Sequence, residues 1–381
     1  MTKVIYISYM RLTDKILRDW YIDGLVEKGV NVEYWDIVSI VREEHNDHGM
    51  VAPAFLHIIR TFGELEAKLC LQENRDAYFV MLISEGGCYT KTYRLLSRNN
   101  CRMLSIAQGA MPSPDKFTEE KILNYLSHPF KLLRRLIDFS KTIFYKKTNL
   151  IKPFDIIFAA GNSIMKNVTY SSRIVPINMC DYDQYINERF ASGLMEKGRY
   201  AVFLDINAVF QSDLKISNLP SLNPSDYFSS LNRFFGLLER EYRIDVVIAA
   251  HPTSNYNNEI FQGRKIYRLK TPTLVRDAEF VITHHSTSLS YAVLNIKPVI
   301  FIYTNEMLTL YKETVIRHIN AQADYLKSKV YNVDEIIHGN QVAIKDIDIL
   351  RYDEYKYSFL TTHESEFLTT QEIIYKEILA I

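Results

Sequence analysis

Short runs of β-branched and aromatic residues alternate with longer stretches of helical periodicity along the first half of the chain. A continuous apolar run is typical of a strand buried on both faces of a sheet, and a helix between two such strands connects them in parallel. Helical periodicity extends from 14 to 28, between the first two runs. The predicted strands are 3–8, 31–36, 77–83, 102–106 and 155–159. The pattern therefore predicts a parallel sheet covered by helices.

The same rhythm starts again after about residue 198. Two successive sheets of one class predict an α/β fold with two Rossmann-like lobes and a cleft between them. Neither half carries a Gly-x-Gly-x-x-Gly sequence between a strand and a helix, so the fingerprint of NAD binding is absent. The second half has predicted strands at 200–205, 245–250, 280–283 and 298–303, and predicted helices at 226–242, 287–295 and 306–328.

These patterns divide the chain into four parts. We assign 1–180 to an N-terminal lobe and 200–345 to a C-terminal lobe. The stretch 181–199 between them is polar and contains Gly193 and Gly198, which favours a linker. The remaining residues, 346–381, are expected to form a helical tail.

Composition and charge narrow the class of protein. With 47% hydrophobic and 24% charged residues, the chain is an ordinary folded protein rather than a disordered, collagen-like or disulfide-stapled one. Forty-five basic residues balance forty-five acidic ones, so we expect no nucleic-acid partner. Four cysteines without metal spacing indicate reduced thiols. No apolar run reaches the roughly 18 residues of a membrane span, and no signal peptide is evident, so we expect a cytoplasmic protein.

The segment 121–147 differs from the rest of the chain in charge. It carries seven basic residues and one Asp, interleaved with Leu, Ile, Phe and Tyr. This composition suits a helix that lies on an anionic membrane surface, at the inner face of the plasma membrane, or a groove for an anionic lipid-linked acceptor. The alternative is a surface helix that packs on the sheet and turns its Lys and Arg to water.

Two polar segments follow predicted strands in the second half. His251-Pro252-Thr253-Ser254 comes directly after the strand 245–250, and His284-His285-Ser286-Thr287-Ser288 follows the strand 280–283. Ligands bind at the carboxyl ends of strands in an open parallel sheet, and hydroxyls at the start of a helix suit phosphate. Together these segments predict a site that holds a nucleotide phosphate between them.

The same segments resemble a known family. HPTSN at 251–255, Phe261-x-Gly263-Arg264, and the stretch 270–301 are similar to the C-terminal half of GT-B glycosyltransferases of bacterial capsule and lipopolysaccharide synthesis. The similarity is to the sialyl-, polysialyl- and Kdo-transferase type, which pairs a His-Pro with a downstream Ser/Thr cluster. It covers roughly 170–305, and the first lobe only in architecture. Near Gln211, where relatives tend to have a His, this chain departs from the pattern.

The resemblance implies roles for individual residues. In that family the His-Pro histidine and the hydroxyls hold the phosphate and ribose of a cytidine nucleotide, and the donor is a CMP-linked acidic sugar. His251 would also stabilise the leaving phosphate, and Arg264 would contact substrate. The donor-binding residues implied or suggested in this chain are His251, Pro252, Thr253, Ser286, Thr287 and Ser288.

The first lobe is expected to supply the acceptor site and the catalytic base. Glu85 follows a predicted strand and precedes Gly86 and Gly87, which suits an exposed carboxylate aimed by a permissive turn. It resembles the acidic-acidic-Gly motif of GT-B sialyltransferases, with Ser84 in place of the first acid. The alternative is a solvated turn glutamate. Gln108 lies on a second loop of the same rim and is a candidate substrate contact.

Two further patterns suggest metal ligands at first sight. Asp181-Tyr182-Asp183 spells the metal motif of GT-A transferases, but it falls at the predicted lobe boundary. We interpret both aspartates as hinge or substrate-lining residues and predict no metal. Of the adjacent His284 and His285, we expect one to be buried and the other to face the cleft, and we count His285 among the substrate contacts.

The sequence as a whole predicts a metal-independent GT-B glycosyltransferase that uses no cofactor, because the nucleotide sugar is a substrate. The expected partners are that donor and a growing surface glycan or lipid-linked acceptor. Three alternatives remain open. They are a CDP-alcohol phosphotransferase of teichoic-acid type, a nucleotide-sugar 2-epimerase, and a non-catalytic nucleotide- or glycan-binding protein.

Overall fold

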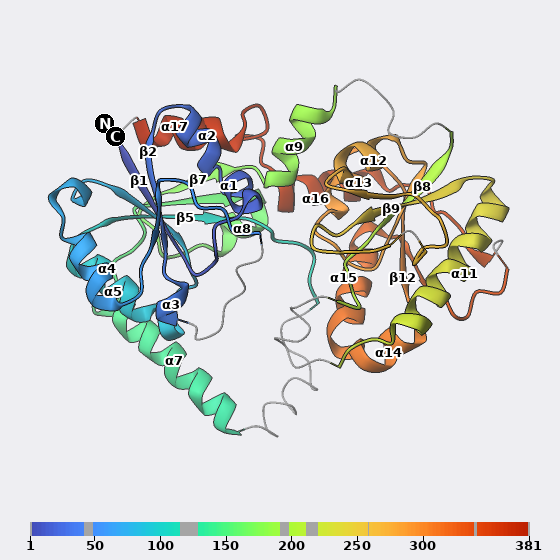
Figure 1. The fold of residues 1–381 in the computed structure, drawn as a ribbon, viewed down its shortest axis with the longest axis horizontal. Coiled ribbons are helices and arrows are strands. Elements are labelled where there is room, and N and C mark those ends of the chain that lie inside the picture. Colours follow the sequence, from blue (N-terminus) through green and yellow to red (C-terminus); the bar gives the residue numbers. More distant parts are fainter. Residues whose placement is uncertain are drawn as a thin grey trace. The chain divides into compact units, whose positions relative to one another are not determined.

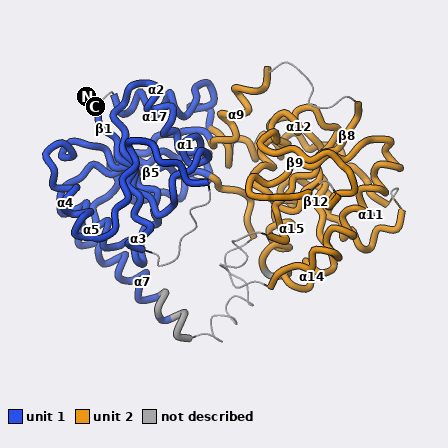
Figure 2. The backbone as a smooth tube through the Cα atoms, in the orientation of Figure 1, with its two compact units in different colours: residues 1–108, 116–178, 362–381 blue, residues 109–115, 179–361 orange. Residues whose placement is uncertain are grey.

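The computed structural model divides into two compact units (Figure 2). Unit 1 comprises Met1–Gln108, Lys116–Asn178 and Thr362–Ile381, and unit 2 comprises Gly109–Asp115 and Met179–Thr361. The C-terminal segment thus returns to unit 1 after the chain has completed unit 2. The structure describes residues 2–41, 49–114, 129–190, 198–210, 220–257, 259–338 and 341–379.

Unit 1 is built on a parallel sheet of seven strands in the order β3-β2-β1-β4-β5-β6-β7 (Figure 1). β1 lies in the interior of the sheet, and Ile5 pairs with Glu33 of β2 on one side and with Phe79 of β4 on the other. The strands are β1 (Lys3–Ser8), β2 (Asn31–Asp36), β3 (Leu56–Ile58), β4 (Tyr78–Leu82), β5 (Arg102–Ala107), β6 (Ile156–Ala160) and β7 (Ile174–Ile177).

Helices follow the strands of unit 1 and are started by local capping. The hydroxyls of Thr13 and Thr61 accept hydrogen bonds from the backbone N–H groups three residues on, which satisfies otherwise unpaired donors at the helix starts. Tyr21, with φ of +61°, separates α1 from α2 where one continuous helix was expected. The helices are α1 (Asp14–Asp19), α2 (Ile22–Glu27), α3 (Val38–Val41), α4 (Phe62–Leu69), α5 (Thr90–Arg98), α7 (Pro129–Lys147), α8 (Gly161–Asn167) and α17 (Thr370–Leu379).

The core of unit 1 lies between this sheet and its helices. Trp35 and Phe79 meet edge to face on neighbouring parts of the sheet, and both are fully buried. Burying one such side chain stabilises the fold by about 1.5–3 kcal/mol. The strands therefore read as continuous apolar runs because both faces of the sheet are covered.

Unit 2 has a parallel sheet of six strands in the order β10-β9-β8-β11-β12-β13. β8 is central, and Phe203 pairs with Ile248 of β9 and Ile282 of β11. The strands are β8 (Tyr200–Leu204), β9 (Asp245–Ala250), β10 (Ile266–Arg268), β11 (Phe280–Thr283), β12 (Val299–Tyr303) and β13 (Lys329–Asn332).

The helices of unit 2 complete the same α/β pattern. Asn223 caps the longest of them, and Pro224 occupies its first turn, where a missing N–H costs nothing. Two π-helical segments, Lys312–Ile316 and Lys356–Leu360, follow α14 and α16. The α-helices are α9 (Cys180–Glu188), α11 (Pro224–Tyr242), α12 (Thr271–Asp277), α13 (Leu289–Leu294), α14 (Asn305–Tyr311), α15 (Arg317–Leu326) and α16 (Ile349–Tyr355).

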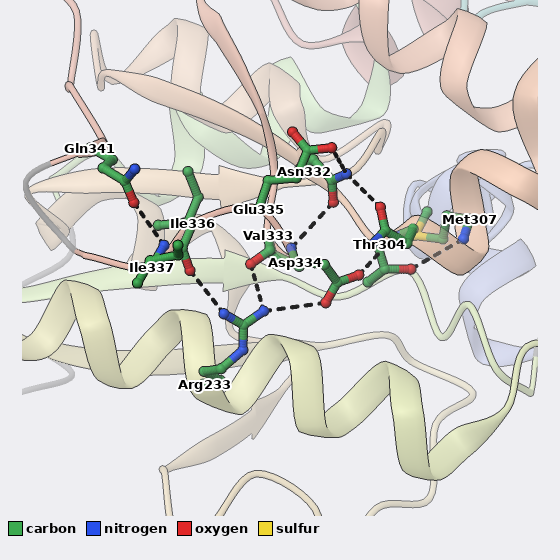
Figure 3. Close-up of polar contacts among 11 residues, drawn as sticks. Arg233, Thr304, Met307, Asn332, Val333, Asp334, Glu335, Ile336, Ile337 and Gln341 are labelled. Atoms are coloured by element: carbon green, nitrogen blue, oxygen red, sulfur yellow. Dashed lines mark hydrogen bonds and ion pairs between the residues drawn. The ribbon is translucent and has the colours of Figure 1, made fainter.

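Arg233 of α11 fixes the loop that follows β13 (Figure 3). Its guanidinium donates to the carbonyl of Ile336 at 2.8 Å and to that of Val333 at 2.9 Å, and it also contacts the Asp334 carboxylate. The second carboxylate oxygen of Asp334 accepts from the N–H of Asn305 at 2.7 Å, where α14 begins. One side chain thereby joins α11, the β13 loop and the start of α14.

The α/β class with two Rossmann-like units is confirmed, and the differences from expectation are local. The edge strands β3, β7, β10 and β13 were not predicted, because each has only three or four residues. β7 is apolar but contains Pro176, and the other three strands mix apolar with polar residues. Within the expected linker 181–199 the chain instead forms α9, while 191–197 lie outside the described residues, as do 121–128 of the basic segment and Gln211.

No helix in the described part of the chain combines the length and hydrophobicity that crossing a bilayer requires.

Candidate functional site

The strand order of unit 2 selects one edge of its sheet as a binding site. The connection that follows β8 runs to β9 on one side, and the connection that follows β11 runs to β12 on the other side. The strand order therefore reverses between β8 and β11, and ligands bind outside the carboxyl ends of strands at such a point. The loops that start there are 205–208 after β8, 251–256 after β9 and 284–288 after β11. Both polar segments predicted from the sequence lie on this edge.

A buried carboxylate, Asp205, organises the first two loops. It accepts hydrogen bonds from the N–H groups of Asn207 at 2.9 Å and His251 at 3.1 Å, and from the Tyr256 hydroxyl at 3.0 Å. Burial raises the pKa of Asp205, and the three donors act in the opposite direction. Three donors on one carboxylate fix the relative positions of the loops after β8 and β9.

Asn207 and Thr253 extend this network to the imidazole of His251. Asn207 adopts φ of +54°, and its side-chain amide donates to the Thr253 hydroxyl at 3.4 Å. That hydroxyl lies 2.8 Å from Nδ1 of His251, and the N–H of Thr253 donates to the same Nδ1 at 3.2 Å. Because a backbone N–H can only donate, Nδ1 is an acceptor, and the neutral ring carries its proton on Nε2. Nε2–H is therefore the donor of this imidazole.

His284 and His285 follow β11 and differ in role. His284 is fully buried, its Nδ1–H donates to the carbonyl of Ile302 at 2.7 Å, and its Nε2 accepts from the Tyr227 hydroxyl at 2.8 Å. His285 is half-buried and stacks on His318 of α15 with 6.1 Å between ring centroids. Burial lowers the pKa of both His284 and His285 to about 4, so both rings are neutral at pH 7. His284 is a structural residue.

The three hydroxyl residues form the turn between β11 and α13. Ser286 accepts the N–H of Ser288 with its side chain at 3.2 Å, and Thr287 is exposed. β8 separates β9 from β11, so the strand ends that carry His251 and these hydroxyls lie two strand spacings apart, about 10 Å. That span matches a phosphate with an attached sugar rather than a single small anion.

Asp181 of α9 supports this turn from behind. Its carboxylate accepts from the hydroxyl of Ser290 and from that of Tyr291 at 3.3 Å, both on α13. The Ser290 hydroxyl also contacts the carbonyl of Thr287 at 2.9 Å. Asp181 therefore positions the hydroxyl turn, while the Asp183 side chain is buried.

Arg264 does not join the site. The register pairs Ile266 of β10 with Ile248 of β9, which sets Arg264 level with Val246, five residues and about 17 Å before His251. Its guanidinium binds both carboxylate oxygens of Glu239, at 2.7 and 2.6 Å, beside a hollow of about 840 Å³ at the amino edge of the sheet. The expected substrate contact is corrected to a structural ion pair on the opposite edge.

Unit 1 repeats this strand order and places Glu85 at the corresponding edge. Glu85 follows β4, the neighbour of β1, and Gly86 and Gly87 adopt φ of +111° and +55°, which glycine tolerates. Its carboxylate forms an ion pair with Lys146 of α7. Gln108 follows β5, and its amide donates to the carbonyl of Asp19 at 3.0 Å. Both residues thus lie at carboxyl ends of strands.

Within the described ranges, no three His, Cys, Asp or Glu side chains gather as a metal-binding group. Asp205, Asn207 and Tyr256 were not singled out from the sequence. The sequence signal that could have identified them is Asp205 at the end of a predicted strand, followed two residues later by Asn207.

Comparisons with known proteins agree on the fold. No family model matches the chain, and no curated protein sequence matches it. The glycosyltransferase of kitacinnamycin superposes with a TM-score of 0.51 at 10% identity, over 99% of this chain and 98% of that one. Staphylococcus aureus MnaA, solved with UDP, superposes with a TM-score of 0.50 at 14% identity, over 99% and 96%. The chain therefore has the two-unit α/β fold of GT-B type that its sequence predicts.

Proposed function

We propose that this protein is a glycosyltransferase that takes a sugar from a nucleotide-activated donor. The observation that carries the proposal is the carboxyl edge of the unit 2 sheet. There a network that starts at buried Asp205 and ends at exposed Thr253 orients His251, and a turn anchored by Asp181 presents Ser286, Thr287 and Ser288. Backbone, hydroxyl and imidazole donors at a topological switch point are the means by which α/β folds hold nucleotide phosphates. The fold shared with a glycosyltransferase supports the same assignment.

The donor is proposed to be a CMP-linked acidic sugar, of the sialic-acid or Kdo kind. Support comes from the pairing of His251-Pro252 with the Ser/Thr turn, which resembles transferases of that type. The acceptor is proposed to be a growing surface glycan or a lipid-linked precursor in the cytoplasm. The proposed transfer uses no resident metal and no cofactor.

The site residues would act on the leaving group. Nε2–H of His251 would donate to the phosphate as the glycosidic bond breaks, which stabilises the charge that develops there. The backbone N–H of Thr253 holds this ring in the required tautomer before substrate arrives, and Asp205 fixes the backbone of His251. Preorganised donors of this kind contribute more to the transition state than to the ground state.

Glu85 of unit 1 is proposed as the base that removes the proton of the acceptor hydroxyl. Its ion pair with Lys146 holds the carboxylate beside the two glycines, at the carboxyl end of β4. A base needs a fixed direction, and this ion pair supplies it.

The test measures products rather than binding alone. CMP-linked N-acetylneuraminic acid and CMP-Kdo are incubated with the protein and a glycan acceptor, and CMP release and acceptor mass are followed. CDP-glycerol and UDP-N-acetylglucosamine run in parallel. We expect CMP release with sugar on the acceptor, reduced at least about 100-fold in His251→Ala.

The matched control is His338→Ala, an exposed histidine beyond β13, three strands past β8 in the sheet order. Its activity should equal that of the wild type. Transfer of glycerol phosphate, or inversion at C2 of the UDP sugar, would replace the proposal with one of the alternative enzymes. Nucleotide binding without any product would indicate a binding protein.

A further inference from the structure

Helix α7 of unit 1 presents a stripe of large apolar side chains to solvent. Pro129–Lys147 forms 19 residues of continuous helix, which Figure 1 shows extending from the body of unit 1. Leu133, Leu136 and Phe144 have 54%, 52% and 57% of their surface exposed. The apolar residues that are exposed along the helix are Leu133, Leu136, Ile137, Phe139, Ile143 and Phe144.

These residues follow the helical repeat. At about 100° per residue, Leu133, Leu136, Ile137, Ile143 and Phe144 fall within an arc of about 120°. Phe139 lies next to this arc. Single exposed apolar residues are ordinary on protein surfaces, whereas a contiguous stripe of this size marks an interaction surface.

The opposite side of the helix already has its partner. Tyr145 packs on the core of unit 1 and lies under the Arg94 guanidinium, at 4.8 Å. Lys146 pairs with Glu85, and the Thr142 hydroxyl lies close to the backbone of Gly86. These residues are centred about 180° from the apolar stripe. Unit 1 therefore holds α7 by one face and leaves the apolar face outward.

Positive charge accompanies the apolar stripe. Residues 129–147 include six basic side chains and one Asp, and among them Lys141 and Lys147 are exposed. Beyond the end of the helix, Leu150 borders a hollow of about 470 Å³ that Lys91 and Arg94 also line. Lys side chains can lay their methylene chains along an apolar surface while the ammonium reaches the phosphate level.

We propose that α7 is a membrane-docking helix that lies in the interface of a bilayer containing anionic lipid. Apolar residues on one side with lysines beside them fit acyl chains below and phosphate headgroups above. A second copy of this chain is disfavoured as the occupant, because two identical basic helices would bring like charges together. The inference stands on α7 alone and does not depend on the nucleotide site.

The test is sedimentation of the full chain with vesicles of phosphatidylcholine, with and without one quarter phosphatidylglycerol. We expect binding to the anionic vesicles, weakened at 1 M salt, where the screening length falls to about 3 Å. Leu136→Gln combined with Phe144→Gln should weaken binding by at least about tenfold, because each side chain has about half its surface left to bury.

The matched control changes two equally apolar, exposed residues elsewhere. Leu350→Gln combined with Phe367→Gln removes side chains that are 80% and 84% exposed and should bind as the wild type does. If both double variants bind the anionic vesicles equally weakly, the assignment to α7 is wrong. It is also wrong if the wild type binds neither kind of vesicle.

Charge reversal provides a second set of variants in which folding is not at risk. Lys141→Glu combined with Lys147→Glu alters exposed side chains and should reduce binding to anionic vesicles by at least about tenfold. Lys270→Glu combined with Lys329→Glu, also exposed, should not. Sedimentation equilibrium without lipid tests whether a second copy of the chain binds the apolar stripe instead. A wild-type dimer that the Leu136/Phe144 variant converts to monomer would show that a second copy covers the stripe, and would overturn the proposal.

Discussion

Acidification should destabilise unit 2 through His284. Its Nδ1–H and Nε2 are both used within the protein, and burial lowers its pKa from 6.5 to about 4. The unfolded chain takes up a proton near pH 6.5 and the folded chain only near pH 4. Stability is therefore complete above pH 6.5 and falls as the pH drops towards 4. At pH 5 this amounts to a loss of about 2 kcal/mol.

The two units can be followed separately in this experiment. Both tryptophans, Trp20 and Trp35, lie in unit 1, so tryptophan fluorescence reports that unit, and circular dichroism reports both. Urea unfolding is measured at pH 7 and pH 5. The transition without a fluorescence change belongs to unit 2, and its free energy should fall by about 2 kcal/mol or more, since His285 shifts in the same direction.

His284→Asn isolates the contribution of this histidine. The asparagine amide can still donate to the carbonyl of Ile302, but it does not titrate. The variant should be less stable at pH 7, because the Tyr227 hydroxyl loses its acceptor, yet the difference between pH 7 and pH 5 should shrink by about 2 kcal/mol. Asp205 has a raised pKa and opposes the trend, but it is present in both proteins and cancels. An unchanged pH difference in the variant would refute the reasoning.

Three further substitutions test individual contacts. Arg264→Met breaks the partly buried ion pair with Glu239 and should lower the free energy of unfolding of unit 2 in urea by about 2 kcal/mol. The affinity for CMP should stay within about twofold of the wild type. A large loss of affinity would show that Arg264 belongs to the binding site. Arg233→Met removes donors from two loop carbonyls and should also cost about 2 kcal/mol; a change below about 0.5 kcal/mol would show that the loop is held otherwise. Glu85→Gln should lower the transfer rate at least about 100-fold. The free energy of unfolding of unit 1 should fall by less than about 1 kcal/mol, because the ion pair between Glu85 and Lys146 is partly exposed. An unaltered rate in a product assay would exclude Glu85 as the base.

The central strands could be predicted from the sequence, and the edge strands could not. The runs 3–8, 31–36, 245–250 and 280–283 coincide with β1, β2, β9 and β11, because strands buried on both faces are rich in β-branched and aromatic residues. An edge strand such as β10 (Ile266–Arg268) has one open side and a mixed sequence, and only its pairing with β9 defines it.

The candidate site shows the same division between local and long-range information. His251 could be found because Pro252 and a strand end mark it locally. Tyr256 could not, because its hydroxyl meets Asp205 only through the pairing of β8 with β9, 51 residues apart along the chain. Arg264 was misplaced for the complementary reason, since its motif is close to His251 in sequence while the register of β10 carries it to the other edge.

Nucleotide binding by unit 2 is the central claim, and the most direct measurement is thermal unfolding in the presence of CMP, CDP, UMP, UDP and GDP. A ligand at 100 times its dissociation constant stabilises the folded state by about 2.7 kcal/mol. CMP is predicted to raise the midpoint temperature of the unit 2 transition, which is the one without a change in tryptophan fluorescence. The increase is expected in the wild type and in His338→Ala but not in His251→Ala. An increase with UDP or GDP alone would support the nucleotide site but would show that the donor carries a different nucleotide. The absence of a shift with every nucleotide, or a shift confined to the tryptophan-bearing unit 1, would contradict the account.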